Sequence, residues 1–290
     1  VTYADVLRAA HVTPDSLLTD HSNIPLDKII SIFDAAALAT SSPCFGAQWA
    51  EAFNPRETGV YGYLLQNAVS VREALYALVR YLSLVIHPAT TAVKTDGAVT
   101  TLTWRLAPWV QSRATQYILF AAGATVARLR SAAGGNWEPA QIEIPCPELP
   151  CKALLHRVLG PSISYRAKET RLHIATNTLD YCNATADPKL FCILQDLSER
   201  MLRERFTEQG YPHVIKRIIS RGLGHGDVTL ETTALEVGTS PRTLQARLAA
   251  EGTSFEDLLQ MTRRQLAEEY LRDTNLPLSE IAQLLGFSEL

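Results

Sequence analysis

The feature that most constrains this sequence of 290 residues is a helix-turn-helix pattern close to its last residue. From Leu278 to Leu290, apolar side chains recur at helical spacing. Ala282 is small enough to let a second helix cross closely, and Gly286 supplies the backbone freedom of a turn. The segment therefore predicts the first helix and the turn of such a unit.

Only the first residues of the second helix are present, beginning with Ser288 and Glu289. Because the two helices of a unit pack against each other, we expect the natural chain to continue for a few dozen residues, on the order of one recognition helix plus a closing helix. Without these helices, we expect four apolar side chains to be partly exposed or mobile: Ile281, Leu284, Leu285 and Phe287.

A complete copy of the pattern lies 48 residues earlier. Ala234 precedes Gly238 by four residues, as Ala282 precedes Gly286. Thr229 is expected to cap the first helix of this copy, because a threonine hydroxyl can accept a hydrogen bond from a free backbone N–H. The repeat predicts two helix-turn-helix units in one chain.

The second helix of the complete copy has a defined start and two distinct faces. Ser240 predicts the N-cap, and Pro241 suits the first helical position, where its missing N–H costs nothing. Leu244 and Leu248 are four residues apart and are expected to face inward. The outer surface, from which side chains can reach base edges and phosphates, is left to Arg242, Thr243, Gln245, Ala246 and Arg247.

The residues between the two units predict a connecting helix that fixes the distance between them. Thr253 and Glu256 have the spacing of a capping box. Apolar residues then repeat at helical spacing, at Phe255, Leu258, Leu259, Leu266, Tyr270 and Leu271.

Several motifs occur here in one order and at defined spacing: Ser240-Pro-Arg-Thr-Leu-Gln, Glu251-Gly-Thr-Ser-Phe, Arg264 with Ala267, and Glu280-Ile-Ala followed by Leu285-Gly-Phe-Ser-Glu289. Through them, residues 212–290 closely resemble the AraC/XylS family of bacterial transcription regulators. The resemblance implies binding to double-stranded promoter DNA. Side-chain type and the resemblance together indicate the DNA-binding residues as Ser240, Arg242, Thr243, Gln245, Arg247, Arg264, Ser288 and Glu289.

Charge alone does not indicate a nucleic-acid partner. From residue 211 onward, 8 Lys and Arg stand against 11 Asp and Glu, a net charge of −3. DNA-binding domains usually carry a positive excess. We therefore expect the basic residues of this region to gather on one side: Lys216, Arg217, Arg221, Arg242, Arg247, Arg263 and Arg264.

Length and composition indicate a two-domain globular protein. The charged fraction is 20%, and no apolar run reaches the length of a membrane span, so we expect no membrane partner and a place in the bacterial cytoplasm. The cysteines are odd in number and scattered, which favours reduced thiols, several of them buried, over a metal or redox site. They are Cys44, Cys146, Cys151, Cys182 and Cys192.

The first two hundred residues predict an α+β domain. Helical periodicity covers residues 3–10, 26–40, 66–86, 113–131 and 152–159. Alternating segments predict strands at 91–95, 98–105, 141–144, 162–166 and 171–175. Asp96-Gly97 is expected to form the hairpin turn between the first two strands, giving a small, mainly antiparallel sheet.

Residues 3–200 also resemble the so-called arabinose-binding N-terminal domain found in one branch of AraC-like regulators. The stretches that carry this resemblance are Ile24-Pro-Leu26, Gly59-Val-Tyr-Gly-Tyr-Leu-Leu65, Ala74 to Tyr81, Leu159-Gly, Ser164-Tyr-Arg and Thr178-Leu-Asp180. The resemblance implies a small-molecule effector, and it does not establish arabinose as that effector.

Aromatic side chains, which offer apolar walls and in most cases a polar tip, are the best sequence-based candidates for an effector site. They are Trp49, Tyr61, Tyr63 and Trp104, together with Phe53, Trp109 and Tyr117. Arg80 and Arg105 could neutralise an acidic effector, although core packing and solvated surfaces are the commoner roles of all these residues.

We therefore predict an α+β sensor domain followed by an all-α DNA-binding domain with two helix-turn-helix units, the second truncated. The predicted boundaries are 1–185 for an effector-binding and dimerisation domain, 186–209 for a connecting helix and 210–290 for the DNA-binding domain. The expected partners are promoter DNA, an unidentified effector and a second copy of the chain, with RNA polymerase as a further candidate and no cofactor.

Two other functions stay open. The chain could be a small-molecule-binding or interaction protein that does not bind DNA on its own. An enzyme is less consistent with the sequence, because no nucleophile, base and oxyanion donor group together. Salt-dependent binding to promoter DNA separates the first alternative from a regulator, and turnover of a metabolite would support the second.

Overall fold

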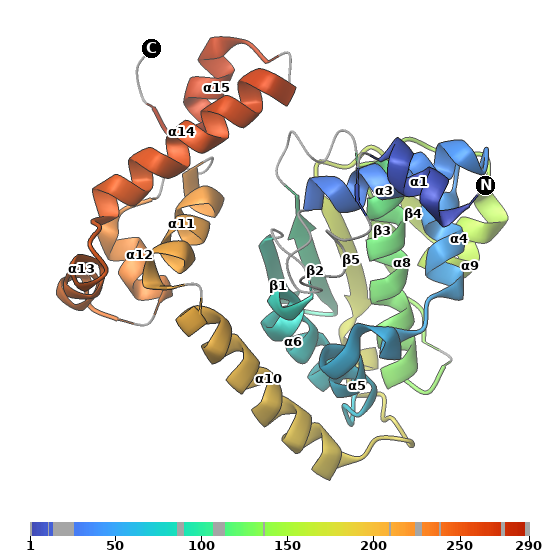
Figure 1. Cartoon of the computed structure of the whole chain (residues 1–290). Helices are drawn as coiled ribbons and strands as arrows, with labels where there is room; N and C mark the ends of the chain where they lie inside the picture. The colour runs from blue at the N-terminus through green and yellow to red at the C-terminus, as the bar shows by residue number, and fades with distance from the viewer. Residues whose placement is uncertain are drawn as a thin grey trace. The chain divides into compact units, whose positions relative to one another are not determined.

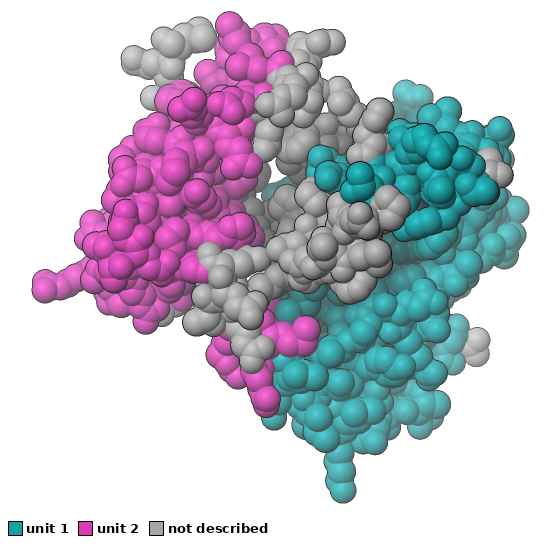
Figure 2. All heavy atoms as spheres, in the orientation of Figure 1, with its two compact units in different colours: residues 1–199 teal, residues 200–290 magenta. Residues whose placement is uncertain are grey.

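The computed structural model describes residues 2–10, 12–13, 26–85, 90–106, 114–135, 137–208, 210–223, 228–237, 239–273 and 276–287. The chain forms two compact units, Val1–Glu199 and Arg200–Leu290, which are coloured separately in Figure 2. The division falls within the long helix α10 (Pro188–Glu208).

The first unit combines helices with a five-stranded sheet (Figure 1). Its α-helices, besides the first part of α10, are α1 (Tyr3–Ala9), α3 (Leu26–Ala39), α4 (Phe45–Ala52), α5 (Gly59–Gln66), α6 (Val71–Tyr81), α8 (Thr115–Ala132) and α9 (Lys152–Leu159). Its short 3-10 helices are η1 (Pro55–Thr58), η2 (Leu82–Leu84) and η3 (Thr176–Asp180). The strands are β1 (Thr90–Asp96), β2 (Val99–Arg105), β3 (Gln141–Glu143), β4 (Ile163–Ser164) and β5 (Thr170–Ala175).

The sheet has the order β1-β2-β5-β3-β4, and only the β3–β4 pair is parallel. The predicted α+β class and mainly antiparallel sheet are confirmed. The predicted turn is wrong by one residue. Asp96 pairs with Val99, so the two turn residues are Gly97 and Ala98, and Gly97 takes the positive φ of 55° that a glycine accepts at the first turn position.

Strand alternation gives the sheet one apolar and one polar face. Leu102, Trp104, Leu172, Ile174 and Ile142 are buried on the apolar face. The residues between them on β2, β5 and β3 are mostly polar and partly exposed. The apolar face therefore meets the helices of the unit.

Helix α8 is the centre of the helical layer, and it contacts α3, α4, α5, α6 and α9. Two glycines allow this close packing. A Cβ on Gly46 of α4 would overlap the backbone carbonyl of Gln116, and a Cβ on Gly123 of α8 would lie 2.6 Å from the Ala50 side chain. A larger residue at either position would force the two helices apart.

Several predicted boundaries need correction. The helix predicted for 66–86 begins only at Val71, because Ser70 accepts a hydrogen bond from the Glu73 N–H and caps it. Its α-helical part ends at Tyr81. Helices α4 and α5 were missed, and the strand predicted for 162–166 is reduced to Ile163–Ser164.

The prediction of reduced thiols is wrong for one pair of cysteines. Cys44 and Cys151 form a disulfide, with Cα atoms 6.6 Å apart, within the usual range. These residues are the N-caps of α4 and α9, two helices that pack together. Cys146 is a buried free thiol, whereas Cys182 and Cys192 are exposed free thiols.

The second unit, apart from the end of α10, is helical in its described residues (Figure 1). Its helices are α11 (Gly210–Gly222), α12 (Leu230–Glu236), α13 (Pro241–Ala250), α14 (Phe255–Asp273) and α15 (Leu278–Leu284). The core between α11, α12, α13 and α14 consists of Val214, Ile215, Ile218, Ile219, Leu223, Ala234, Leu244, Leu248, Leu258 and Leu259. The predicted inward position of Leu244 and Leu248 is confirmed.

The start of α14 differs from the predicted capping box by one residue. Ser254, and not Thr253, caps the helix, because its hydroxyl accepts the Asp257 N–H at 3.1 Å. The Asp257 carboxylate in turn accepts the Ser254 N–H at 3.1 Å, in the place predicted for Glu256. The apolar repeat also ends earlier than expected, because Leu271 is exposed.

The end of α15 is better packed than expected. Ile281 and Leu285 are only 5% and 4% exposed, so the prediction that they lack packing partners is wrong. Gly286 has a φ of 72° and lies against Leu223, which follows α11. Phe287, at 47% exposed, follows the prediction.

The described residues contain neither a membrane-spanning helix nor a cluster of metal ligands. No helix among them has the length and apolar character needed to cross a membrane. Within the same residues, no group of three or more His, Cys, Asp and Glu side chains is arranged to hold a metal ion.

Candidate DNA interface and effector cavity

Helix α13 has the shape expected of a recognition helix. Ser240 caps it, with its hydroxyl accepting the Thr243 N–H at 3.1 Å, and Pro241 occupies the first helical position. Leu244 and Leu248 anchor the helix in the core of the second unit. The opposite face, with Arg242, Thr243, Gln245 and Arg247, is exposed.

The polar residues of this face differ in how they are held. The side chains of Arg242 and Gln245 make no hydrogen bond or ion pair within the described part of the chain. Arg247 donates from Nη1 to the Tyr211 hydroxyl at 2.9 Å, and its guanidinium carbon lies 5.0 Å from the centre of that ring. Two side chains are thus free to meet a partner, and one is fixed in direction.

The other basic residues of this unit do not all serve the same surface. Arg263 donates to the carbonyl oxygens of Leu285 and Gly286 at 3.0 and 3.4 Å, so it holds the end of α15. Arg264 is 83% exposed and pairs with Glu268 one turn along α14. The expected gathering of the basic residues on one side stays a prediction, and Arg263 has this structural role as well. Ser288 and Glu289 lie outside the described residues.

A cavity of about 130 Å³ lies in the first unit between α8 and the apolar face of β1 and β2. Its wall is mainly apolar and aromatic and includes Leu78, Leu102, Trp104, Leu106, Tyr117, Phe120 and Ala124. An apolar hollow with a few polar groups is typical of a small-molecule site. Segments far apart in sequence, from η1 to α8, build it.

The polar groups of this wall are few, and two of them already donate hydrogen bonds within the protein. The hydroxyls of Thr58 and Thr125 donate to the backbone carbonyls of Pro55 and Ala121, each at 2.8 Å. Arg128 also lines the cavity, and its guanidinium carbon lies 4.8 Å from the centre of the Phe53 ring and 5.2 Å from that of Tyr61. Burial raises the pKa of Tyr61 to about 12, so its hydroxyl stays protonated near neutral pH.

The candidate effector residues are divided between different places. Trp104 lines the cavity, and Tyr61 lies next to it, with its hydroxyl donating to the Leu78 carbonyl at 3.2 Å. Tyr63 is 45% exposed, and it lines neither this cavity nor the second hollow, which Trp49 lines. Trp49 lies along a second, more open hollow with Phe33 and Phe45. Trp109 is outside the described residues.

The two arginines named as candidates are both paired with carboxylates. Arg80 donates to Glu199 at 2.5 Å. Arg105 pairs with Glu169, which also accepts from Arg171 at 2.7 Å. Neither arginine lines the cavity. Arg128, which the sequence pattern did not single out, does line it.

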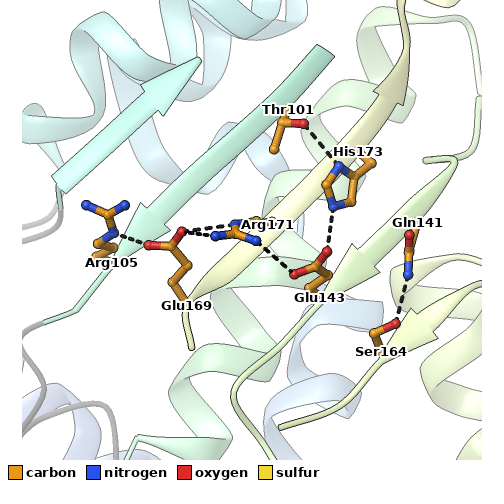
Figure 3. Close-up of polar contacts among 8 residues, drawn as sticks. All are labelled: Thr101, Arg105, Gln141, Glu143, Ser164, Glu169, Arg171 and His173. Carbon is orange, nitrogen blue, oxygen red and sulfur yellow. Dashed lines mark hydrogen bonds and ion pairs between the residues drawn. The ribbon is translucent and has the colours of Figure 1, made fainter. Parts of the chain in front are cut away.

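Figure 3 shows that Arg105 belongs to a polar network across the sheet. The network continues from Glu169 through Arg171 to Glu143, whose other oxygen lies 2.9 Å from His173 Nε2. His173 Nδ1 shares a hydrogen bond with the Thr101 hydroxyl at 3.0 Å. This network stabilises the polar face of the sheet, and the cavity lies on the other face.

Comparison with known families matches both parts of the chain. Residues 1–182 match the arabinose-binding domain of AraC transcription regulators, at their N-terminus. Residues 233–290 match a helix-turn-helix domain.

Individual proteins show the same similarity. An ornithine utilization regulator of Pseudomonas aeruginosa is 24% identical over 286 residues, which are 97% of this chain and 83% of the relative. The regulator VirS of Mycobacterium tuberculosis is 36% identical over 134 residues, 46% of this chain and 33% of the relative. The crystal structure of the transcriptional regulator CdpR from Pseudomonas aeruginosa superimposes with a TM-score of 0.51 at 22% identity, over 99% of this chain and 89% of the other. That structural likeness supports the fold.

Proposed function

Because the chain belongs to the AraC transcription regulators with an arabinose-binding-type N-terminal domain, we propose that it reads promoter DNA through α13 and that an effector in the cavity beneath α8 changes this binding. It is a ligand-sensing regulator with a helix-turn-helix domain, and its relatives are transcription regulators. We propose no chemical transformation of the effector.

The exposed face of α13 carries the proposal. Arg242 and Gln245 have no partner within the described part of the chain, and both side chains have the donors that read base edges in the major groove. Because the net charge from residue 211 onward is −3, a few well-placed cations must supply the attraction to phosphates. Arg247, directed by Tyr211, is suited to this role.

Coupling between effector and DNA requires two states of the protein that bind both partners differently. We propose that a second copy of the chain provides these states, with α10 as the contact. Leu190, Ile193 and Met201 of α10 are exposed apolar residues that a second copy would cover. A dimer of this kind would place its two α13 helices on successive half-sites of the DNA. RNA polymerase is a further proposed partner, and the bacterial cytoplasm is the proposed compartment.

DNA binding can be tested without knowing the promoter. The full chain is used to select duplexes from a randomised pool, and the affinity for the enriched duplex is then measured by fluorescence anisotropy. We expect enrichment of a defined sequence and a loss of affinity in Gln245→Ala. The matched control is Gln260→Ala on α14, which removes an exposed amide whose one partner among the described residues is Glu256 in the same helix.

We expect the control to bind as the unchanged chain does. Failure to enrich any sequence, or equal binding by Gln245→Ala, would contradict the proposed interface. If a sequence is enriched but neither variant changes the affinity for it, the interface does not lie on α13.

A further inference from the structure

Arg128 is a buried cation with no counter-ion among the described residues. It lies on the inward side of α8 and is only 8% exposed. Its Nε has no hydrogen-bond acceptor, and within the described residues no carboxylate pairs with its guanidinium. Burying an unpaired charge is costly, and desolvation accordingly lowers the pKa of Arg128.

The surroundings of Arg128 compensate this cost only in part. The rings of Phe53 and Tyr61 face the guanidinium, and such cation–π contacts are favourable. Aromatic faces, however, do not accept all the N–H groups of an arginine, which has five donors in a fixed planar fork. A planar anion with two acceptor oxygens, such as a carboxylate, would match this fork.

The remaining wall of the cavity offers few polar groups. Thr58 and Thr125 already donate their hydroxyl hydrogens to backbone carbonyls, so Thr91 carries the one remaining threonine hydroxyl among the described lining residues. A sugar would leave several hydroxyls without partners against Leu102, Trp104 and Phe120, and each unsatisfied polar group is unfavourable. An apolar ligand body would instead replace water against apolar walls.

The cavity is partly open, and its volume is a guide to the size of ligand that it holds. Its volume is about 130 Å³. A dry cavity of roughly 150 Å³ accommodates benzene. One aromatic ring or a short aliphatic chain is therefore the size that fits.

We propose that this cavity binds an apolar monocarboxylate of one aromatic ring or a short chain, with the carboxylate held by Arg128. Tyr117 also lines the cavity, and its hydroxyl has no hydrogen-bond partner among the described residues, so it can donate to the same carboxylate. The inference rests on the proposed function, since it names the class of effector that the sensor domain recognises.

Binding is measured by calorimetry on the full chain, with benzoate and hexanoate as the probes. Benzyl alcohol tests whether the ligand needs a charge, and acetate tests whether it needs an apolar body. L-arabinose tests the sugar after which the domain family is named. We expect benzoate and hexanoate to bind and to raise the melting temperature, and the three other compounds to have little effect. Binding of none of the acids, or equal binding of benzyl alcohol and benzoate, would overturn the proposal. So would binding of arabinose in place of the acids.

Arg128→Met keeps the volume of the side chain and removes its charge. We expect benzoate to bind this variant roughly 10- to 100-fold more weakly, as for the loss of charged hydrogen bonds. We also expect its melting temperature without ligand to equal or exceed that of the unchanged chain, because an unpaired buried charge is gone. Unchanged benzoate affinity would overturn the proposal. Arg157→Met, which removes an exposed arginine paired with Glu51, is the control and should bind benzoate normally.

A second variant keeps the test decisive if Arg128→Met does not fold. Ala124→Leu fills the cavity from α8 without changing charge, and it should block benzoate. Binding unaffected by this substitution would also contradict the site. A chain that binds its selected duplex but none of the acids would contradict this inference alone, whereas a chain that binds acids but no duplex would contradict only the proposed function.

Discussion

Arg247 on the outer face of α13 is held by Tyr211 of α11, through a hydrogen bond of 2.9 Å to the tyrosine hydroxyl and a contact with its ring. Tyr211 is itself fixed, because its backbone N–H donates to Glu251 at the end of α13. Since an arginine has five N–H donors, Arg247 can keep this bond and still meet a phosphate. The arrangement holds a cation in a defined position on the exposed face of α13.

The first prediction concerns this positioning. Tyr211→Phe removes the hydrogen bond to Arg247 and keeps the ring, so we expect duplex affinity to fall by about 1 kcal/mol, with thermal stability nearly unchanged. Arg247→Ala should cost more and weaken all sequences alike, as expected for a phosphate contact. Anisotropy titrations with the selected duplex and with an unrelated duplex measure both effects. Full affinity in Arg247→Ala would remove this residue from the interface.

The second prediction separates base reading from phosphate binding. If Arg242 reads a guanine, Arg242→Ala should cost on the order of 1 to 3 kcal/mol and relax the preference at one base pair. Affinities for a set of duplexes with single base-pair changes reveal this pattern. Arg72→Ala, in the first unit, removes the same charge from an exposed pair with Asp180 and serves as the control. A uniform loss across the set would assign Arg242 to the backbone.

The sequence was sufficient to predict helix α13, but it was not sufficient to predict the cavity. Ser240, Pro241, Leu244 and Leu248 define α13 through local rules of capping and spacing, which need no tertiary information. Arg128 was missed because a charged residue in a helix normally lies on the surface. Only the packing of α8 against the sheet places it inside.

Other differences have the same origin. The disulfide joins Cys44 and Cys151, which are 107 residues apart, so their spacing could not reveal the pair. Helix α11, by contrast, had a readable signal in the recurring apolar pairs Val214-Ile215 and Ile218-Ile219, which its core confirms.

The third prediction concerns the polar network on the sheet. Hydrogen bonds from Arg105, and then from Arg171, lower the pKa of Glu169, and these outweigh the opposing effect of burial. The stabilisation is therefore present above the ordinary pKa of a glutamate and is lost as the pH falls through the lowered value. Glu169→Gln should reduce the free energy of unfolding by about 1 kcal/mol at pH 7.

Urea denaturation at pH 7 and at a pH below the ordinary glutamate pKa tests this result. The difference between Glu169→Gln and the unchanged chain should shrink at the lower pH. Glu148→Gln, which affects an exposed pair with Lys152, should have little effect at either pH. A difference for Glu169→Gln that does not depend on pH would contradict the assignment to charge.

The fourth prediction distinguishes the five cysteines. Iodoacetamide at neutral pH should label Cys182 and Cys192 in the folded chain, because both are exposed free thiols. Cys146 should resist labelling, since burial raises its pKa to about 12 and hides the sulfur. Denaturation without reductant should add only Cys146, and reduction should then add Cys44 and Cys151. Mass spectrometry of the peptides shows the order, and early labelling of Cys44 in the folded chain would contradict the disulfide.

The most direct test of the central claim is the salt dependence of duplex binding. The slope of the logarithm of the association constant against the logarithm of the KCl concentration is measured for the full chain, Arg247→Ala and Gln245→Ala with the selected duplex. If α13 contacts the duplex as proposed, affinity falls steeply with salt, and the slope becomes shallower by about 1 in Arg247→Ala but not in Gln245→Ala. Binding that does not depend on salt, or identical affinities and slopes for all three proteins, would contradict DNA recognition through this helix.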